Sequence, residues 1–98
     1  MSVHEQLSEF DPAEYLRSPE DMAAYLEAWL AEAPEDVAGI AQGLGHIARA
    51  RGMTHVAQSA GLSRESLYRA LGVDGNPSLA TVVKVARALG LRLSVVPV

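Results

Sequence analysis

Four side chains within six positions carry the clearest chemistry in this sequence: Arg64, Glu65, Tyr68 and Arg69. Each arginine can bond in bidentate fashion to a guanine edge, and the glutamate can accept a hydrogen bond from a cytosine amino group. The tyrosine can contact a thymine methyl group or a phosphate. This set predicts direct readout of double-stranded DNA in the major groove.

A helix-turn-helix would place these side chains on the outward face of its second helix, and residues 53–71 have the spacing of one. Ala57 is small where the second helix would cross the first, and Gly61 tolerates the positive φ that the turn requires. The residues expected to face inward are Val56, Ala60, Leu62, Leu67 and Ala70. The alternative is an ordinary helical hairpin with a glycine turn.

Polar residues around the turn complete the expected DNA surface. Their hydroxyl and amide groups suit phosphate oxygens, and they are Thr54, Gln58 and Ser63. Thr54 and Ser63 are also expected to cap the two helices, and Gly72 to end the second in a left-handed turn. Basic residues that flank the unit could touch the DNA backbone or simply be solvated: Arg49, Arg51, Lys84 and Arg87.

One helix-turn-helix distinguishes its site too weakly from the other sequences of a genome, because one good bidentate contact contributes only roughly 1–3 kcal/mol of discrimination. We therefore expect a two-fold dimer on an inverted repeat, with half-site centres about 34 Å apart.

Capping signals predict further helices before this unit. Asp11 and Pro12 indicate a short helix that ends near Arg17, and Ser18 with the next proline indicates a second that stops before Pro34. A stripe at helical spacing marks one face of the second: Met22, Tyr25, Leu26, Trp29 and Leu30.

A third helix is expected from residues 34–36 to Gly52. It contains Gly39, Gly43 and Gly45, and each costs about 1 kcal/mol relative to alanine, so we expect another helix to pack very closely there.

The end of the chain predicts a turn at residues 74–77, one more helix and a strand. Ser78 can cap the helix and Gly90 can end it. The apolar side of this helix is expected to consist of Leu79, Val82, Val83, Val85, Ala86 and Leu89. The tail alternates at first and is β-branched at its end, so Leu91, Leu93 and Val95 are expected to form a strand for dimerisation. A lone strand needs a partner, which would be its symmetry mate or another protein's sheet.

Length and composition predict one soluble domain, with a possible appendage, in a reducing cytoplasm. The chain has 98 residues and no cysteine, which excludes disulfides and thiolate metal sites. No secretory signal or apolar run of transmembrane length is recognisable, so no membrane association is expected.

The charge is divided between the two halves of the chain. Residues 1–45 contain ten acidic residues and one basic residue, a net −9, whereas residues 46–98 contain seven basic and two acidic ones, a net +5. This division predicts a polyanion as the partner of the second half and a basic partner for the first. The alternative is that the acids merely cover the solvent-facing sides of the early helices.

Most of the chain resembles the HigA-type addiction-module antidote proteins, a branch of the Xre/Cro-like helix-turn-helix superfamily. The resemblance extends from Phe10 to Leu93 and is most specific at residues 61–68, 75–77 and 88–91. It implies an antitoxin that neutralises a small basic toxin of the RelE/ParE fold, of HigB type, by direct binding. It also implies that the antitoxin, alone or with its toxin, represses their shared promoter.

Together these observations predict a mainly α fold of five to six helices, with a Cro/C1-type helix-turn-helix and one C-terminal β-strand. Residues 1–33 would be acidic toxin-binding helices, and residues 34–98 would form the DNA-binding domain. The expected toxin contacts are aromatic and apolar: Phe10, Tyr15, Leu16, Tyr25 and Trp29. Tyr25 and Trp29 have core packing as an alternative. The protein would be cytoplasmic, and associated with the nucleoid when bound to its operator.

Catalysis finds little support in the sequence, and no cofactor or metal is expected. His4, His46 and His55 are scattered, each read as a surface or capping residue, and no glycine-flanked nucleophile turn is present. Two alternatives to the antitoxin repressor are a free-standing Xre-type regulator and a pure inhibitor whose helix-turn-helix no longer reads DNA. A neighbouring gene for a small basic protein would favour the antitoxin over the free-standing regulator.

Overall fold

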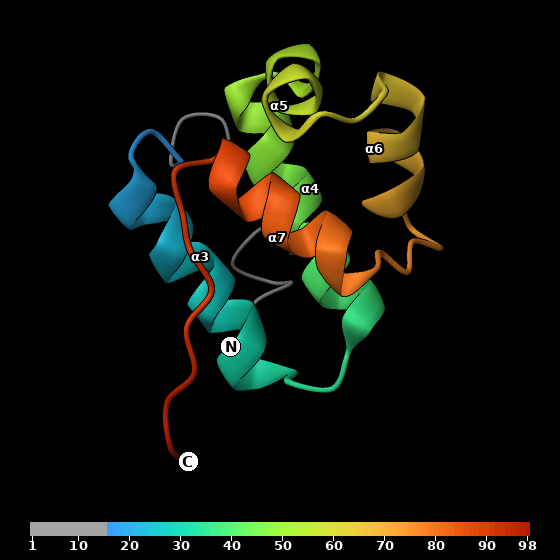
Figure 1. The fold of residues 1–98 in the computed structure, drawn as a ribbon. Coiled ribbons are helices and arrows are strands. Elements are labelled where there is room, and N and C mark those ends of the chain that lie inside the picture. The colour runs from blue at the N-terminus through green and yellow to red at the C-terminus, as the bar shows by residue number, and fades with distance from the viewer. Residues whose placement is uncertain (1–15) are drawn as a thin grey trace.

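The structure, a computed structural model, describes residues 16–98, and these form five α-helices and no β-strand (Figure 1). The helices are α3 (Pro19–Glu32), α4 (Val37–Arg51), α5 (Met53–Ala60), α6 (Arg64–Ala70) and α7 (Leu79–Ala88). The helix expected between Pro12 and Arg17 lies largely outside the described residues. None of the helices described has both the length and the hydropathy of a membrane span.

Serine side chains begin three of the helices, as the sequence predicts. The Oγ atom of Ser18 accepts from the Asp21 amide at 3.1 Å, that of Ser63 from Ser66 at 3.0 Å, and that of Ser78 from Thr81 at 3.1 Å. Each bond satisfies an amide in the first turn that has no partner within the helix.

Two of the predicted caps are wrong. Thr54 lies inside α5, which begins after Gly52 and has no side-chain cap, because the chain passes from α4 to α5 through this single residue. Gly72 does not adopt a positive φ; α6 instead ends at Leu71, whose φ is −104°.

Gly61 ends α5 in a left-handed conformation, with φ of 70°. The Gly61 amide donates to the Gln58 carbonyl at 3.2 Å, and the Leu62 amide donates to the Ala57 carbonyl at 2.9 Å. This pair of bonds is a Schellman motif, which turns the chain sharply toward α6. The turn of the predicted helix-turn-helix therefore has the backbone conformation expected of it.

One hydrophobic core joins the helices, and α3 is part of it. Its largest fully buried members include Trp29 and Met22 of α3, Leu44 and Ile47 of α4, and Leu67 of α6. The boundary expected after residue 33 therefore does not separate two cores.

The glycines of α4 lie where other elements approach closely. A Cβ atom at Gly43 would lie 2.6 Å from Cδ1 of Trp29, and one at Gly39 would lie 3.0 Å from Cζ3 of the same indole. A Cβ atom at Gly45 would lie 2.9 Å from the Leu71 carbonyl oxygen. The expected close packing of another helix is confirmed at Gly39 and Gly43, where α3 approaches, whereas the neighbour of Gly45 is Leu71, just after α6.

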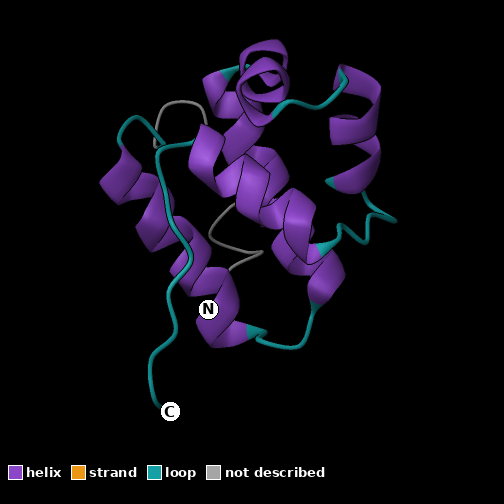
Figure 2. Ribbon diagram, viewed as in Figure 1, coloured by secondary structure: helices purple, strands orange, loops and turns teal. Residues whose placement is uncertain are grey.

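The predicted C-terminal strand is not seen in the single chain. Figure 2 shows the tail after α7 as a loop that runs beside α3, and within residues 16–98 there is no other strand with which it could pair. Leu91 packs against the core, Leu93 is 47% exposed and Val95 is 98% exposed. The apolar side predicted for α7 is also too wide, because Leu79 and Val83 are exposed whereas Val85, Ala86 and Leu89 are buried.

Candidate nucleic-acid interface

Helix α6 lies at the edge of the molecule and rests on α5 (Figure 1). Leu67 anchors it, with none of its surface exposed. The exposed side chains of this short helix include Arg64, Glu65, Tyr68 and Arg69, together with Ser66. The structure therefore brings together on one solvent-facing helix the residues that the sequence predicts to read bases.

Arg64 and Tyr68 act as a unit on this surface. The Nη2 atom of Arg64 donates a hydrogen bond to the Tyr68 hydroxyl at 3.3 Å, and the guanidinium carbon lies 5.3 Å from the ring centroid. A cation in this position is attracted by the negative face of the ring. The tyrosine thus orients the arginine predicted to bind guanine.

Arg49 reaches the same ring from the last turn of α4. Its guanidinium carbon lies 5.9 Å from the Tyr68 ring centroid. The sequence indicates Arg49 only as one of four flanking basic residues, because a contact between residues so far apart depends on where α6 lies relative to α4. This face therefore combines residues from two helices: Arg49 of α4 with Arg64, Tyr68 and Arg69 of α6.

The residues predicted to contact phosphates are all exposed, but the Ser63 hydroxyl is already hydrogen-bonded within the protein. Thr54 and Gln58 are exposed on α5. Ser63 is exposed as well, but its hydroxyl accepts from the Ser66 amide and donates to the Ser66 hydroxyl at 2.8 Å. The hydroxyl proton of Ser63 is therefore already used within the helix cap and is not available to a phosphate oxygen in this conformation.

Three of the residues predicted to contact a toxin are in the core. Leu16 is 1% exposed, Tyr25 is 5% exposed and Trp29 is 2% exposed. Such side chains have no surface to offer a partner, so the alternative of core packing fits Tyr25 and Trp29, and Leu16 is corrected in the same way. Phe10 and Tyr15 lie outside the described residues.

Tyr25 joins α3 to α4 through a polar contact as well as by packing. Its hydroxyl is hydrogen-bonded to Nδ1 of His46, and the two rings meet edge to face with centroids 6.0 Å apart. Burial raises the pKa of Tyr25, and a hydrogen bond with the Trp29 side chain acts in the opposite direction. His46 is therefore a half-buried partner of Tyr25, whereas the sequence indicates a surface or capping residue.

The acidic residues form a separate region of the surface. Those that are exposed on α3 and on the segment after it are Glu20, Glu27, Glu32, Glu35 and Asp36. In Figure 1, α3 and α6 lie on opposite sides of the molecule. This placement is compatible with two partners of opposite charge and also with acids that simply face solvent.

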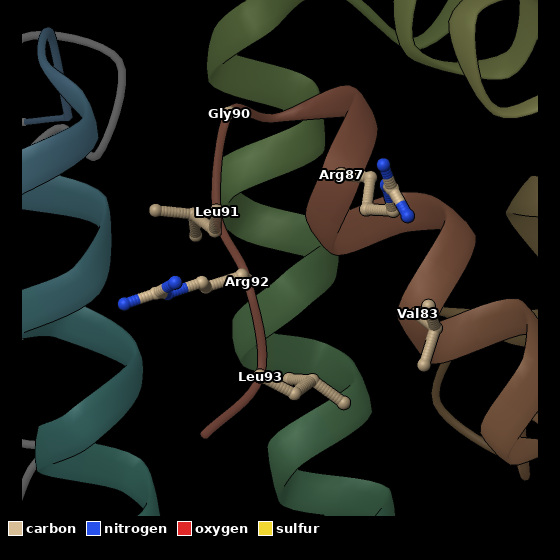
Figure 3. A pocket seen from close by; sticks show the side chains of 6 residues that line it. All are labelled: Val83, Arg87, Gly90, Leu91, Arg92 and Leu93. Carbon is tan, nitrogen blue, oxygen red and sulfur yellow. The ribbon is translucent and has the colours of Figure 1, made fainter.

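A groove separates α7 from the C-terminal tail (Figure 3). Its volume is about 710 Å³, and its lining consists of Val83, Arg87, Gly90, Leu91, Arg92 and Leu93. In the view of Figure 3, Leu93 extends toward α7 and Arg92 toward α3. Two of the residues predicted for dimerisation, Leu91 and Leu93, are therefore at this groove.

Residues 16–98 contain no group of three or more histidine, aspartate or glutamate side chains that could hold a metal ion. The polar groups exposed on α5 and α6 instead form a surface suited to hydrogen bonding.

Comparison with known proteins adds a family to this geometry. A family model described as "Probable addiction module antidote protein" matches residues 6–97. A protein of Haemophilus influenzae, described as an uncharacterized protein, is 50% identical over 91 residues, which are 93% of this chain and 92% of that protein. No solved structure matches the chain at a significant level.

Proposed function

The chain belongs to the addiction module antidote family, and we propose that it is the antitoxin of a type II toxin–antitoxin module. In this proposal it binds and neutralises a small basic toxin of the RelE/ParE fold, of HigB type. It also represses the promoter of both genes through a Cro/C1-type helix-turn-helix. The observation that carries the proposal is the family match, which spans residues 6–97 and so includes both the acidic and the basic half.

The DNA-binding part of the proposal is supported by the exposure of α6. Arg64, Glu65 and Arg69 face solvent on a helix that Leu67 holds against the core, so base edges in a major groove are within their reach. The protein would bind an inverted repeat as a homodimer. Leu91, Leu93 and Val95 of the tail would contribute to the dimer by pairing with the tail of a second copy.

The toxin-binding part is supported by the exposed acids of α3 and the following segment. Carboxylates attract a basic partner and speed its association. Phe10 and Tyr15 are proposed as the apolar anchors, since Leu16, Tyr25 and Trp29 are used by the core. The protein would act in the cytoplasm, and at the nucleoid when bound to its operator, without a cofactor and without catalysis.

Co-expression with the adjacent gene tests the proposal. We expect expression of the neighbour alone to stop growth, co-expression of this chain to restore it, and the two proteins to co-purify. Growth arrest that this chain does not relieve, or a neighbour that never binds it, would overturn the antitoxin function.

The second candidate is a free-standing Xre-type regulator without a toxin. The burial of Tyr25 and Trp29 favours it, because two aromatic residues of the acidic half are thereby explained without a partner. Absence of a neighbouring gene for a small basic protein, together with operator binding, would select this candidate.

A further inference from the structure

We propose that Arg49, in the last turn of α4, is a phosphate-binding residue of the DNA surface and that Tyr68 of α6 holds it in place. The inference rests on the proposed DNA binding and extends the contact surface beyond the helix-turn-helix. Its ligand is a phosphodiester group of the duplex backbone.

The Tyr68 ring gathers two guanidinium groups that come from different helices. The guanidinium carbon of Arg49 lies 5.9 Å from the ring centroid, and that of Arg64 lies 5.3 Å from it. Tyr68 itself is 39% exposed, and both arginines are exposed. The ring thus limits the directions that two long side chains can take while leaving them open to a ligand.

Space for Arg49 is provided one helical turn earlier. A Cβ atom at Gly45 would lie 3.1 Å from Nη1 of Arg49 and 2.9 Å from the carbonyl oxygen of Leu71. A glycine at this position lets the end of α6 approach α4 and lets the guanidinium fold across toward Tyr68.

The like charges of Arg49 and Arg64 favour the binding of an anion between them. Two positive charges that share one ring repel each other, and among residues 16–98 neither arginine is in an ion pair with a carboxylate. A phosphate near them offsets the repulsion, and guanidinium edges present N–H groups in the geometry that phosphate oxygens accept. Double-stranded DNA carries one such charge for about every 1.7 Å of its axis.

Arg49 is assigned to a phosphate and not to a base because of the helix it belongs to. The reading side chains Arg64 and Glu65 are in the first turn of α6, whereas Arg49 comes from α4 and contacts the Tyr68 ring. A contact at the flank of the reading helix positions the protein on the duplex but carries no sequence information. Loss of Arg49 should therefore weaken binding to every sequence equally.

The test measures binding by fluorescence anisotropy over a range of salt concentrations. The probes are a duplex containing the promoter of the chain's own gene and a scrambled duplex of equal length. For Arg49→Gln we expect the plot of log Kobs against log salt to become less steep by about 0.9 per bound chain, on both duplexes alike. The matched control is Arg17→Gln, which removes the same charge from an exposed position just before α3 and should keep the wild-type slope.

Variants of Tyr68 test its positioning role. Tyr68→Phe retains the ring and should retain the contribution of Arg49 to the slope. Tyr68→Leu removes the ring, and in that background Arg49→Gln should change the slope much less than it does in the wild-type protein. An undiminished effect of Arg49→Gln in the Tyr68→Leu background would refute the role of the ring.

The outcomes separate this inference from the proposed function. If the wild-type protein binds the promoter duplex and Arg49→Gln keeps the wild-type slope, the inference is overturned and DNA binding stands. If the wild-type protein binds neither duplex, DNA binding itself is overturned, and the inference with it.

Discussion

The indole of Trp29 in α3 lies directly on the backbone of Gly43 in α4. A Cβ atom at Gly43 would lie 2.6 Å from Cδ1 and 2.8 Å from Nε1 of the indole. Trp29 is only 2% exposed and belongs to the same core cluster as Leu44 and Leu67, so it has little freedom to move away. This contact ties the acidic α3 to the helices that carry the predicted DNA surface.

Gly43→Ala should therefore destabilise the fold although alanine is the better helix former. Overpacking of a filled core costs about 1–3 kcal/mol, which should exceed the roughly 1 kcal/mol gained in helix propensity. Urea unfolding followed by circular dichroism measures the difference. Ala38→Gly, at an exposed position of α4, is the control for propensity alone, and a Gly43→Ala variant more stable than wild type would contradict the prediction.

Gly61→Ala should also be destabilising, but for a reason that involves no clash. No atom lies within 4 Å of a Cβ at this position, whereas the φ of +70° is unfavourable for an L-residue by roughly 1–2 kcal/mol. Gly61→Asn is the matched comparison, because asparagine tolerates the left-handed region better. Equal thermal stabilities of the two variants would argue against backbone strain as the cause.

Arg64→Ala and Arg69→Ala should each weaken binding to the promoter duplex by about 1–3 kcal/mol and relax its sequence preference. The reason is the loss of a bidentate contact from the exposed face of α6. Titrations with promoter and scrambled duplexes measure both effects, with Arg17→Ala as the control for charge. Binding like that of wild type in both variants would favour a pure inhibitor that does not read DNA.

The buried hydroxyl of Tyr25 predicts a loss of stability at high pH. Burial raises its pKa above the ordinary value of 10.0, so the folded protein favours the protonated hydroxyl. The contribution of this hydroxyl to the free energy of unfolding is therefore complete below pH 10 and is lost as the pH rises through the folded-state pKa. Urea unfolding on either side of that pH should show a smaller alkaline loss for Tyr25→Phe than for wild type. An unchanged loss in Tyr25→Phe would refute the prediction.

Charge in the C-terminal tail should prevent the proposed dimer. Leu93→Asp and Val95→Asp place a carboxylate where the tail is exposed and apolar, and burying it against a second copy is unfavourable. Sedimentation velocity should show monomers for these variants and dimers for wild type. Val73→Asp, at a 75% exposed position outside the tail, is the control. Dimers in all variants would exclude the tail from the interface.

Much of the fold is predictable from short stretches of sequence. Ser18, Ser63 and Ser78 begin helices and Gly61 and Gly90 end them, as expected. These predictions hold because each depends on a hydrogen bond between residues three to five positions apart. The strand expected at residues 91–96 is absent from the single chain, since a strand also needs a partner backbone that no local pattern supplies.

The sequence by itself determined where most of the helices lie and which side chains α6 exposes, because local capping and helical periodicity decide both. Only the tertiary structure decided that Tyr25 and Trp29 belong to the core and that Arg49 meets Tyr68. Those outcomes depend on how α3 packs on α4 and on where α6 lies relative to α4, and the closest approaches are at Gly43 and Gly45. Glycines within a helix indicate that another element packs closely against them, but they do not identify the side chain that does so.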